Sequence, residues 1–253
     1  MIEFSYWFML PMGIGISVVA MFFGLGGGVL WMPVLLMSTD LQPDDAVICT
    51  VIIQFFGQLS ASINNNRTGL INWQLVQMMV IFGIPAVITG VLLSFLLHPL
   101  WIEFFLGLTI FFIAYVFLRG DEFFVEGSDK ADLEAAKRGR WITTTGSILT
   151  GFLGIGVGDW LVPFFNMHCK LSMARAVASS IALMMILSLT AVVMHLFLGR
   201  AVSWSIVLPG IIGVLFGAQL GSRLLQWIPE TYFKELFVLM LVFIATHVTF
   251  NAF

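Results

Sequence analysis

The chain has 253 residues, of which 60% are hydrophobic and only 10% are charged, and its formal net charge is -3. A mean hydropathy of +1.03 excludes a soluble globular domain, and the lack of a basic stripe argues against nucleic acid as a partner. We therefore expect an all-α polytopic membrane protein whose surroundings are a lipid bilayer.

Apolar runs follow one another along the chain, some continuous and some interrupted. A helix needs about 20 apolar residues to cross a hydrocarbon core of about 30 Å. The continuous runs lie at residues 46–63, 75–97, 100–118, 173–198, 205–225 and 233–250. Two further regions, 11–37 and 141–167, are apolar but broken by glycines and a proline. The sequence thus predicts transmembrane helices at the continuous runs and broken helices at the other two.

A polar segment at residues 119–140 divides the chain. It holds six of the 14 acidic residues and five of the 11 basic residues. We interpret it as a solvated linker that includes a short helix at 130–137. The predicted organisation is a first transmembrane repeat at 1–118, the polar linker at 119–140 and a second transmembrane repeat at 141–253.

The two halves share motifs at a constant spacing along the chain. The stretch GLGGGVLWMP at 24–33 corresponds to GIGVGDWLVP at 154–163. The two stretches are 130 residues apart, and we call this difference the repeat offset. The same offset relates three further pairs, which are Ala46 and Ala176, Thr50 and Ser180, and Pro99 and Pro229. Internal duplication of this kind is typical of secondary transporters.

The positive-inside rule discriminates between two topologies. If each broken region crosses the membrane once, the 11 Lys and Arg residues divide seven to four between the two sides. If each enters, turns at its glycines and leaves on the same face, the halves are inverted and the division is ten to one, with only Arg200 outside. We therefore favour two inverted repeats, each a Gly-broken re-entrant helical hairpin plus three transmembrane helices, with the linker in the cytoplasm. An arrangement with eight conventional crossings is the alternative.

The glycines of the broken regions predict an anion-binding site. A helix that starts inside the membrane has unpaired backbone N–H groups and a partial positive charge at its first turn. Glycines leave these amides accessible to a ligand. The candidate substrate-binding glycines are Gly26, Gly27, Gly28, Gly156 and Gly158. The alternative interpretation is close helix packing by small residues.

Polar side chains near the breaks extend the candidate site. Asp159 is a carboxylate within the apolar zone, which makes it a candidate for proton coupling, or alternatively a helix N-cap. Thr50, Gln54 and Gln58 recur every four residues and share one helix face, and Ser180 corresponds to Thr50. These groups either hydrogen-bond the substrate or bond to neighbouring helices.

With its two glycine motifs at 24–33 and 154–163, each ending in proline, and the alanines Ala46 and Ala176 that follow, the chain resembles the TauE/SafE family of sulfite exporters and sulfonate permeases. The resemblance covers nearly the whole chain. It implies a permease for sulfur-containing anions such as sulfite or small organosulfonates, in the inner membrane of a bacterium. The second motif departs from the pattern at Val157 and Asp159.

Alternating access of a mid-membrane site, coupled to protons, is the mechanism that we expect for this substrate class. The alternative is a cation-coupled or cation-binding transporter that uses the broken helices and Asp159. The sequence has no metal-binding spacing and no nucleophile paired with a base, so we expect neither an enzyme nor a cofactor. The sequence does not decide whether the chain forms a homo-oligomer.

Overall fold

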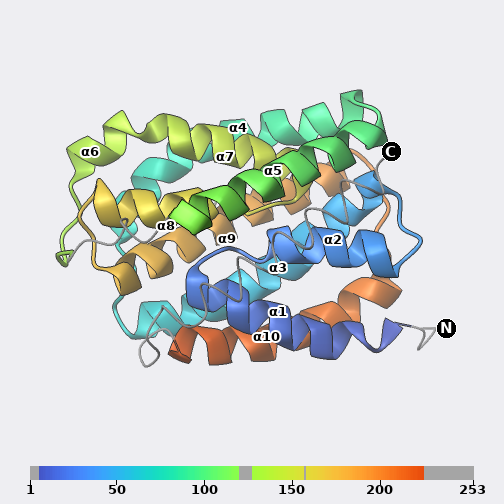
Figure 1. Ribbon diagram of the computed structural model, residues 1–253, viewed down its shortest axis with the longest axis horizontal. Helices are drawn as coiled ribbons and strands as arrows, with labels where there is room; N and C mark the ends of the chain where they lie inside the picture. Colours follow the sequence, from blue (N-terminus) through green and yellow to red (C-terminus); the bar gives the residue numbers. More distant parts are fainter. Residues whose placement is uncertain (1–5, 120–126, 157, 225–253) are drawn as a thin grey trace.

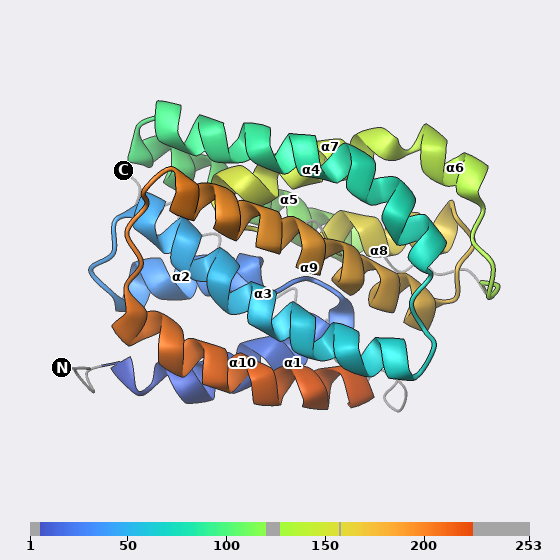
Figure 2. The same cartoon turned by 180° about the vertical axis from the view of Figure 1, so that it is seen from behind.

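The computed structural model describes residues 6–119, 127–156 and 158–224 (Figures 1 and 2). The helices in chain order are α1 (Met9–Phe23), α2 (Gly28–Ser38), α3 (Pro43–Arg67), α4 (Trp73–Leu96), α5 (Pro99–Arg119), α6 (Leu133–Arg138), α7 (Arg140–Leu153), α8 (Gly158–Met167), α9 (Met173–Phe197) and α10 (Trp204–Leu224). Apart from one isolated bridge, the described residues contain no strand. The predicted all-α class is therefore confirmed.

Both broken regions form two short helices that turn back on each other. The C-cap of α1 is Gly24, whose φ is 74°, and the C-cap of α7 is Gly154, whose φ is 70°. Glycine adopts this left-handed conformation without the steric cost that a Cβ brings. In Figure 1, α1 and α2 open towards one end of the molecule, while α7 and α8 open towards the opposite end. The predicted helix breaks at the glycines are confirmed.

Long apolar helices surround the two hairpins. α3, α4, α9 and α10 are long and apolar enough to cross a membrane, and α5 has 21 residues. These elements match the runs predicted at 46–63, 75–97, 100–118, 173–198 and 205–225. The run predicted at 233–250 lies outside the described residues.

Each hairpin packs against helices of the other half. α1 lies along α10, α7 lies along α4, and α3 and α9 lie side by side in the middle of the bundle (Figure 2). The repeat offset converts α1 into α7 and α4 into α10, so the pairings are equivalent. The third helix expected for the second half lies outside the described residues, and two complete inverted repeats stay a prediction.

Glycines allow the closest of these pairings. Gly213, Gly217 and Gly221 recur every four residues on α10, and a methyl group built on each would lie 2.3–2.5 Å from a backbone carbonyl oxygen of α1. Small residues at this spacing let two helix backbones approach in lipid, where van der Waals packing replaces the hydrophobic effect. α1 is thereby held along most of its length.

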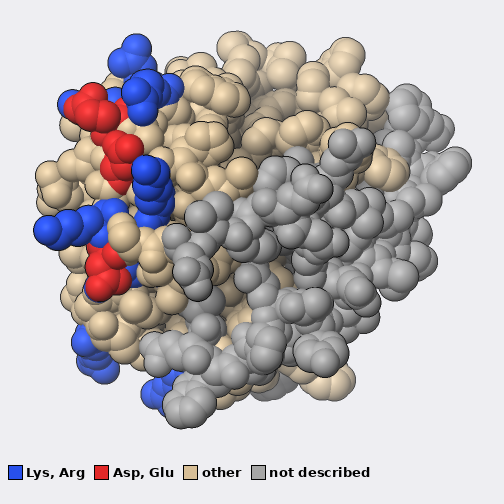
Figure 3. Space-filling view, turned by 60° about the vertical axis from the view of Figure 1, so that its left-hand side comes forward, with Lys and Arg blue, Asp and Glu red and all other residues tan. Residues whose placement is uncertain are grey.

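The surface has the banding of a membrane protein. Exposed tryptophans lie at or just before the first turn of several helices, at both ends of the bundle: Trp7, Trp73, Trp101, Trp141 and Trp204. Tryptophan favours the two interfaces between lipid and water. Figure 3 shows charged side chains gathered at the end where α6 lies. Arg67 and Arg223 end α3 and α10 at that same end, whereas Arg200 follows α9 at the opposite one.

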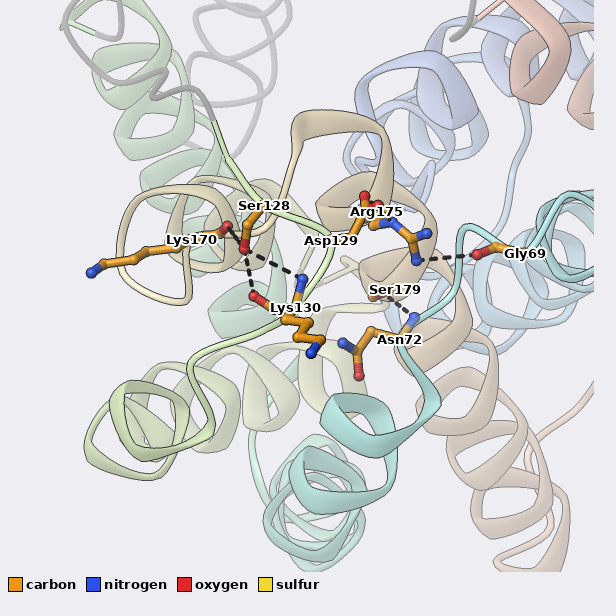
Figure 4. A network of polar contacts seen from close by, with 8 residues as sticks. All are labelled: Gly69, Asn72, Ser128, Asp129, Lys130, Lys170, Arg175 and Ser179. Atoms are coloured by element: carbon orange, nitrogen blue, oxygen red, sulfur yellow. Dashed lines mark hydrogen bonds and ion pairs between the residues drawn. The ribbon is translucent and has the colours of Figure 1, made fainter.

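The described part of the linker docks on the loop between α8 and α9. Ser128 and Leu171 form a backbone bridge, and the amide of Asp132 donates to the carbonyl of Cys169. The amide of Ser128 donates to the carbonyl of Lys170 (Figure 4). The Asp132 carboxylate caps α6 by accepting a hydrogen bond from the amide of Ala135. This hydrogen bond holds the pKa of the carboxyl below its usual range. Burial raises the pKa of the Cys169 thiol to about 12. The linker thus covers the C-terminal end of α8. The predicted boundaries at 119 and 140 stay predictions.

Candidate functional site

The turns of the two hairpins meet at the centre of the bundle. Gly26 and Gly156 face each other, since a methyl group built on either would lie within 3.2 Å of the other's Cα. All described residues of the two turns are buried. The broken ends of α1, α2, α7 and α8 therefore surround one buried point.

The contact between the turns is reciprocal. A methyl group on Gly28 would lie 2.1 Å from the carbonyl oxygen of Gly154, and one on Gly158 would lie 2.0 Å from that of Gly24. The repeat offset relates these two contacts to each other. They are the close packing that the sequence offered as the alternative role of the glycines. In this arrangement the space beside Gly28 and Gly158 is filled by backbone.

Two glutamines of α3 tie both turns to one helix. The Nε2 of Gln58 donates to the carbonyl of Gly26 at 3.2 Å, and the Nε2 of Gln54 donates to that of Gly154 at 3.2 Å. The Oε1 atoms of both glutamines are buried and have no partner among the described residues. A buried acceptor without a partner is costly, so these oxygens mark a place where a ligand or water would fit.

The first turn of α2 presents unpaired amides beside these glutamines. The amides of Leu30 and Trp31 bond to the carbonyl of Gly27, whereas those of Gly28 and Val29 have no hydrogen-bond partner within the described part of the chain. The Oε1 of Gln54 lies 2.9 Å from the methyl position on Gly28. A buried helix start with free N–H groups attracts negative charge.

The corresponding face of α9 is less polar. Met184 stands where α3 has Gln54, and its sulfur accepts the amide of Gly158 at 3.1 Å. Ser188 stands where α3 has Gln58, and its buried hydroxyl has no partner among the described residues. The start of α8 is therefore covered by a thioether, unlike the start of α2.

The remaining predicted site residues lie around this centre. The hydroxyl of Thr50 donates to the sulfur of Met32 on α2, and Thr50 also approaches Gly154. Gly27 contacts its own hairpin, at Ala20 and Trp31. Ser180 is buried on α9, and its hydroxyl has no partner among the described residues.

Asp159 lies in the first turn of α8, but its side chain is outside the described part of the chain. Its predicted role in proton coupling and its alternative role as an N-cap both stay predictions.

Sequence reasoning left out Met184 and Ser188 as site residues. The signal was available, because the repeat offset carries Gln54 to Met184 and Gln58 to Ser188. Methionine and serine are common in apolar helices, so the residue types alone do not indicate a binding site. Within the described residues, no group of three or more His, Cys, Asp or Glu side chains could hold a metal ion.

The family model described as Sulfite exporter TauE/SafE matches residues 9–248, nearly the whole chain. No curated protein and no solved structure matches at a significant level.

Proposed function

Because the chain belongs to the TauE/SafE sulfite exporter family, a family of membrane transporters, we propose that it carries sulfite or small organosulfonates as a secondary transporter. We propose that it works by alternating access, with no enzymatic activity and with proton coupling. Its place in this proposal is the inner membrane of a bacterium, with the linker at 119–140 in the cytoplasm.

The observation that carries the proposal is the buried meeting point of the two hairpin turns. There the unpaired amides of Gly28 and Val29 lie beside Gln54, whose Oε1 has no partner among the described residues. Rotation of the Gln54 amide would turn its Nε2 towards an anion held at the start of α2. We propose Gly26, Gly27, Gly28, Thr50 and Gln54 as the substrate-binding residues of the first half.

In the second half we propose Gly156, Gly158 and Ser180 as further contacts. Gly156 and Gly158 line the other side of the same point. Ser180 is buried on α9, and its hydroxyl has no partner among the described residues, so it can donate to a substrate. The amide of Gly158 reaches a substrate only when the Met184 sulfur moves away.

Magnitudes restrict what the site can hold. A helix terminus stabilises an anion by up to about 2 kcal/mol. Complete dehydration of a monovalent ion costs on the order of 20 kcal/mol. The bound anion must therefore keep part of its water, and a monoanion such as bisulfite or a sulfonate fits better than a dianion.

The close contact of the turns supports the proposed alternating access. Since backbone fills the space at Gly28 and Gly158, an anion enters only when the hairpins separate towards one face. Asp159, in the first turn of α8, is the candidate that would take up a proton with the anion.

A second candidate function is cation binding at the same point. The Oε1 atoms of Gln54 and Gln58, which have no partner among the described residues, are acceptors, and oxygen acceptors are the ligands that sodium prefers. In this alternative the broken helices form a coupling site for a cation.

Transport in proteoliposomes tests both candidates. Uptake of radiolabelled sulfite and isethionate is measured with chloride as competitor, at one acidic and one alkaline external pH, with and without a sodium gradient. We expect saturable uptake of one sulfur compound that chloride does not inhibit and that acid accelerates, and a loss of this acceleration in Asp159→Asn. Sodium-driven signals without sulfite or sulfonate flux would overturn the proposal in favour of the cation.

A further inference from the structure

His195 is a buried titratable group that the proposed function does not use. It lies in the last turn of α9, and its side chain is fully buried. Its Nε2 lies 3.2 Å from the carbonyl oxygen of Gly151, and its Nδ1 has no partner among the described residues.

The carbonyl that His195 contacts belongs to the broken end of the second hairpin. α7 ends at Leu153, so the carbonyl of Gly151 is one of the last four, which lack an amide within the helix. A carbonyl only accepts, so Nε2 carries the proton and donates. The ring thereby caps α7 close to the turn where the two hairpins meet.

The charged groups around this ring come from one end of the bundle. Phe95 of α4 lies 6.1 Å from the His195 ring, and the Arg200 guanidinium lies 4.1 Å from that same Phe95 ring. Arg200 is paired with Asp44, and Asp45 is the next residue along α3.

The other elements packed on α9 contribute few charges. α1 and α4 have no charged residue, and α3 has, beyond its first turn, only Arg67 at its far end. α7 has only Arg140 at its far end, and α8 has only Asp159. Arg200 is therefore the cation that a protonated His195 would face, and the ion pair of Arg200 is the nearest compensation.

The observed contacts fit a neutral ring. A proton on Nδ1 would create a second buried N–H with no acceptor among the described residues, beside Arg200. The C-terminus of α7 stabilises a cation, but by less free energy than the burial of an unpaired cation costs. A protonated ring is thus stable only where Nδ1 reaches water or a new acceptor, and the described residues around the closed ring provide no acceptor.

We propose that His195 is a proton-binding site that controls the position of α7. In its neutral form it holds the broken end of α7 in the closed arrangement, and its protonation releases α7 so that the hairpin turns separate. This inference rests on the proposed transport function, and it adds a proton site distinct from Asp159.

The first half provides an internal control. The repeat offset carries His195 to Asn65, which is equally buried and whose amide atoms have no partner among the described residues. Asparagine does not titrate near neutral pH. Only one of the two equivalent positions can therefore respond to a proton.

The variant that tests this is His195→Gln, whose Nε2 can still donate to Gly151 but which cannot titrate. Asn65→Gln is the matched control at the equivalent position. The first readout is amide hydrogen exchange of residues 140–156 in detergent, at acidic and alkaline pH after correction for the intrinsic exchange rate. We expect acid to increase exchange there in the unmodified chain and in Asn65→Gln, and to leave it unchanged in His195→Gln.

The second readout is the ratio of sulfite flux at acidic to that at alkaline pH. One titrating group changes its protonated fraction by up to about tenfold per pH unit, and we expect this ratio to fall to about one in His195→Gln. If His195→Gln does not fold, His195→Asn, which places the residue of the first half here, is measured instead.

The outcomes separate the two proposals. A native exchange response and a native flux ratio in the non-titrating variant would overturn the role of His195. Loss of the pH dependence of flux in Asp159→Asn but not in His195→Gln would also overturn the role of His195. An unmodified chain that carries no sulfite but keeps the acid response of α7 would overturn the transport proposal while supporting the proton site.

Discussion

The two hairpin turns make equivalent backbone contacts, Gly28 with Gly154 and Gly158 with Gly24, but their walls differ. On the side of α3, Gln54 and Gln58 donate to carbonyls of both turns, and their oxygens have no partner among the described residues. At the equivalent positions of α9, Met184 covers the amide of Gly158, and the Ser188 hydroxyl bonds to no described residue of either turn. The duplicated frame therefore carries one polar wall and one largely apolar wall.

This difference separates what the frame needs from what a ligand needs. The glycines recur in both halves because each turn must admit a carbonyl of the other at close range. The glutamines are present only in the first half, and there they cost stability, because their buried oxygens have no partner among the described residues. We infer that the polar wall is kept for binding, and that the substrate lies closer to α3 than to α9.

The largest effect is expected from alanine at the reciprocal contact. In Gly28→Ala or Gly158→Ala, the new methyl group would meet a backbone carbonyl 2.1 or 2.0 Å away. Overpacking of this kind costs about 3 kcal/mol or more when backbone must shift. Thermal unfolding in detergent should show a large loss of stability, equal in the two variants.

The control is Gly15→Ala on α1, where a methyl group has nothing within 4 Å. There we expect a gain of about 0.5–1 kcal/mol from the helix propensity of alanine. A Gly28→Ala variant as stable as Gly15→Ala would show that the turns do not touch. Unequal losses at Gly28 and Gly158 would break the equivalence of the two turns.

Much of this frame could be predicted from the sequence because it depends on periodic or repeated signals. Hydropathy located the long helices, and the glycine clusters located both breaks. The repeat offset also carries the pairing of α1 with α10 to that of α7 with α4. These features depend on the backbone and on burial, which leave regular traces in a sequence.

The walls of the site could not be predicted in the same way. Met184 gives no sequence signal that its sulfur covers an amide, because methionine is common in apolar helices. His195 lies near a helix end with no motif around it, and only the packing of α9 against α7 brings it to Gly151. Contacts between helices that are distant in the sequence depend on the tertiary arrangement, which no local pattern encodes.

Exchange of the two walls is the next test. Gln54→Met should lower sulfite affinity by about tenfold or more, because a hydrogen bond to a charged group contributes about 1.5–3 kcal/mol. Met184→Gln, in contrast, should keep or raise affinity, since it adds a donor and uncovers the amide of Gly158. Isothermal titration of the detergent-solubilised protein with sulfite measures both.

The double variant Gln54→Met with Met184→Gln moves the polar wall to α9. Recovered affinity in the double variant would mean that either half can hold the anion. An equal loss in both single variants would contradict the inference that the substrate lies closer to α3.

The smallest effect is expected at the ends of the bundle, where the two halves again differ. The start of α3 meets the loop after α9 through the pair of Asp44 and Arg200, and Arg200 also donates to the carbonyl of Ser94. At the other end, the start of α9 meets the loop after α3, where Arg175 pairs with Asp129 and donates to the carbonyl of Gly69 (Figure 4). The first junction is the more buried, since the side chain of Asp44 is 21% exposed and that of Asp129 is 80% exposed.

Burial decides how much each pair contributes, because water screens an exposed pair. Asp44→Asn should therefore lower the free energy of unfolding by about 1 kcal/mol, between the values for exposed and for fully buried pairs. Asp129→Asn should change it by no more than about 0.5 kcal/mol, and added salt should remove that difference. Denaturation of the two variants at low and high salt measures both values. Equal losses would mean that the two junctions are equally strong, so that the asymmetry of the molecule is confined to the walls around the hairpin turns.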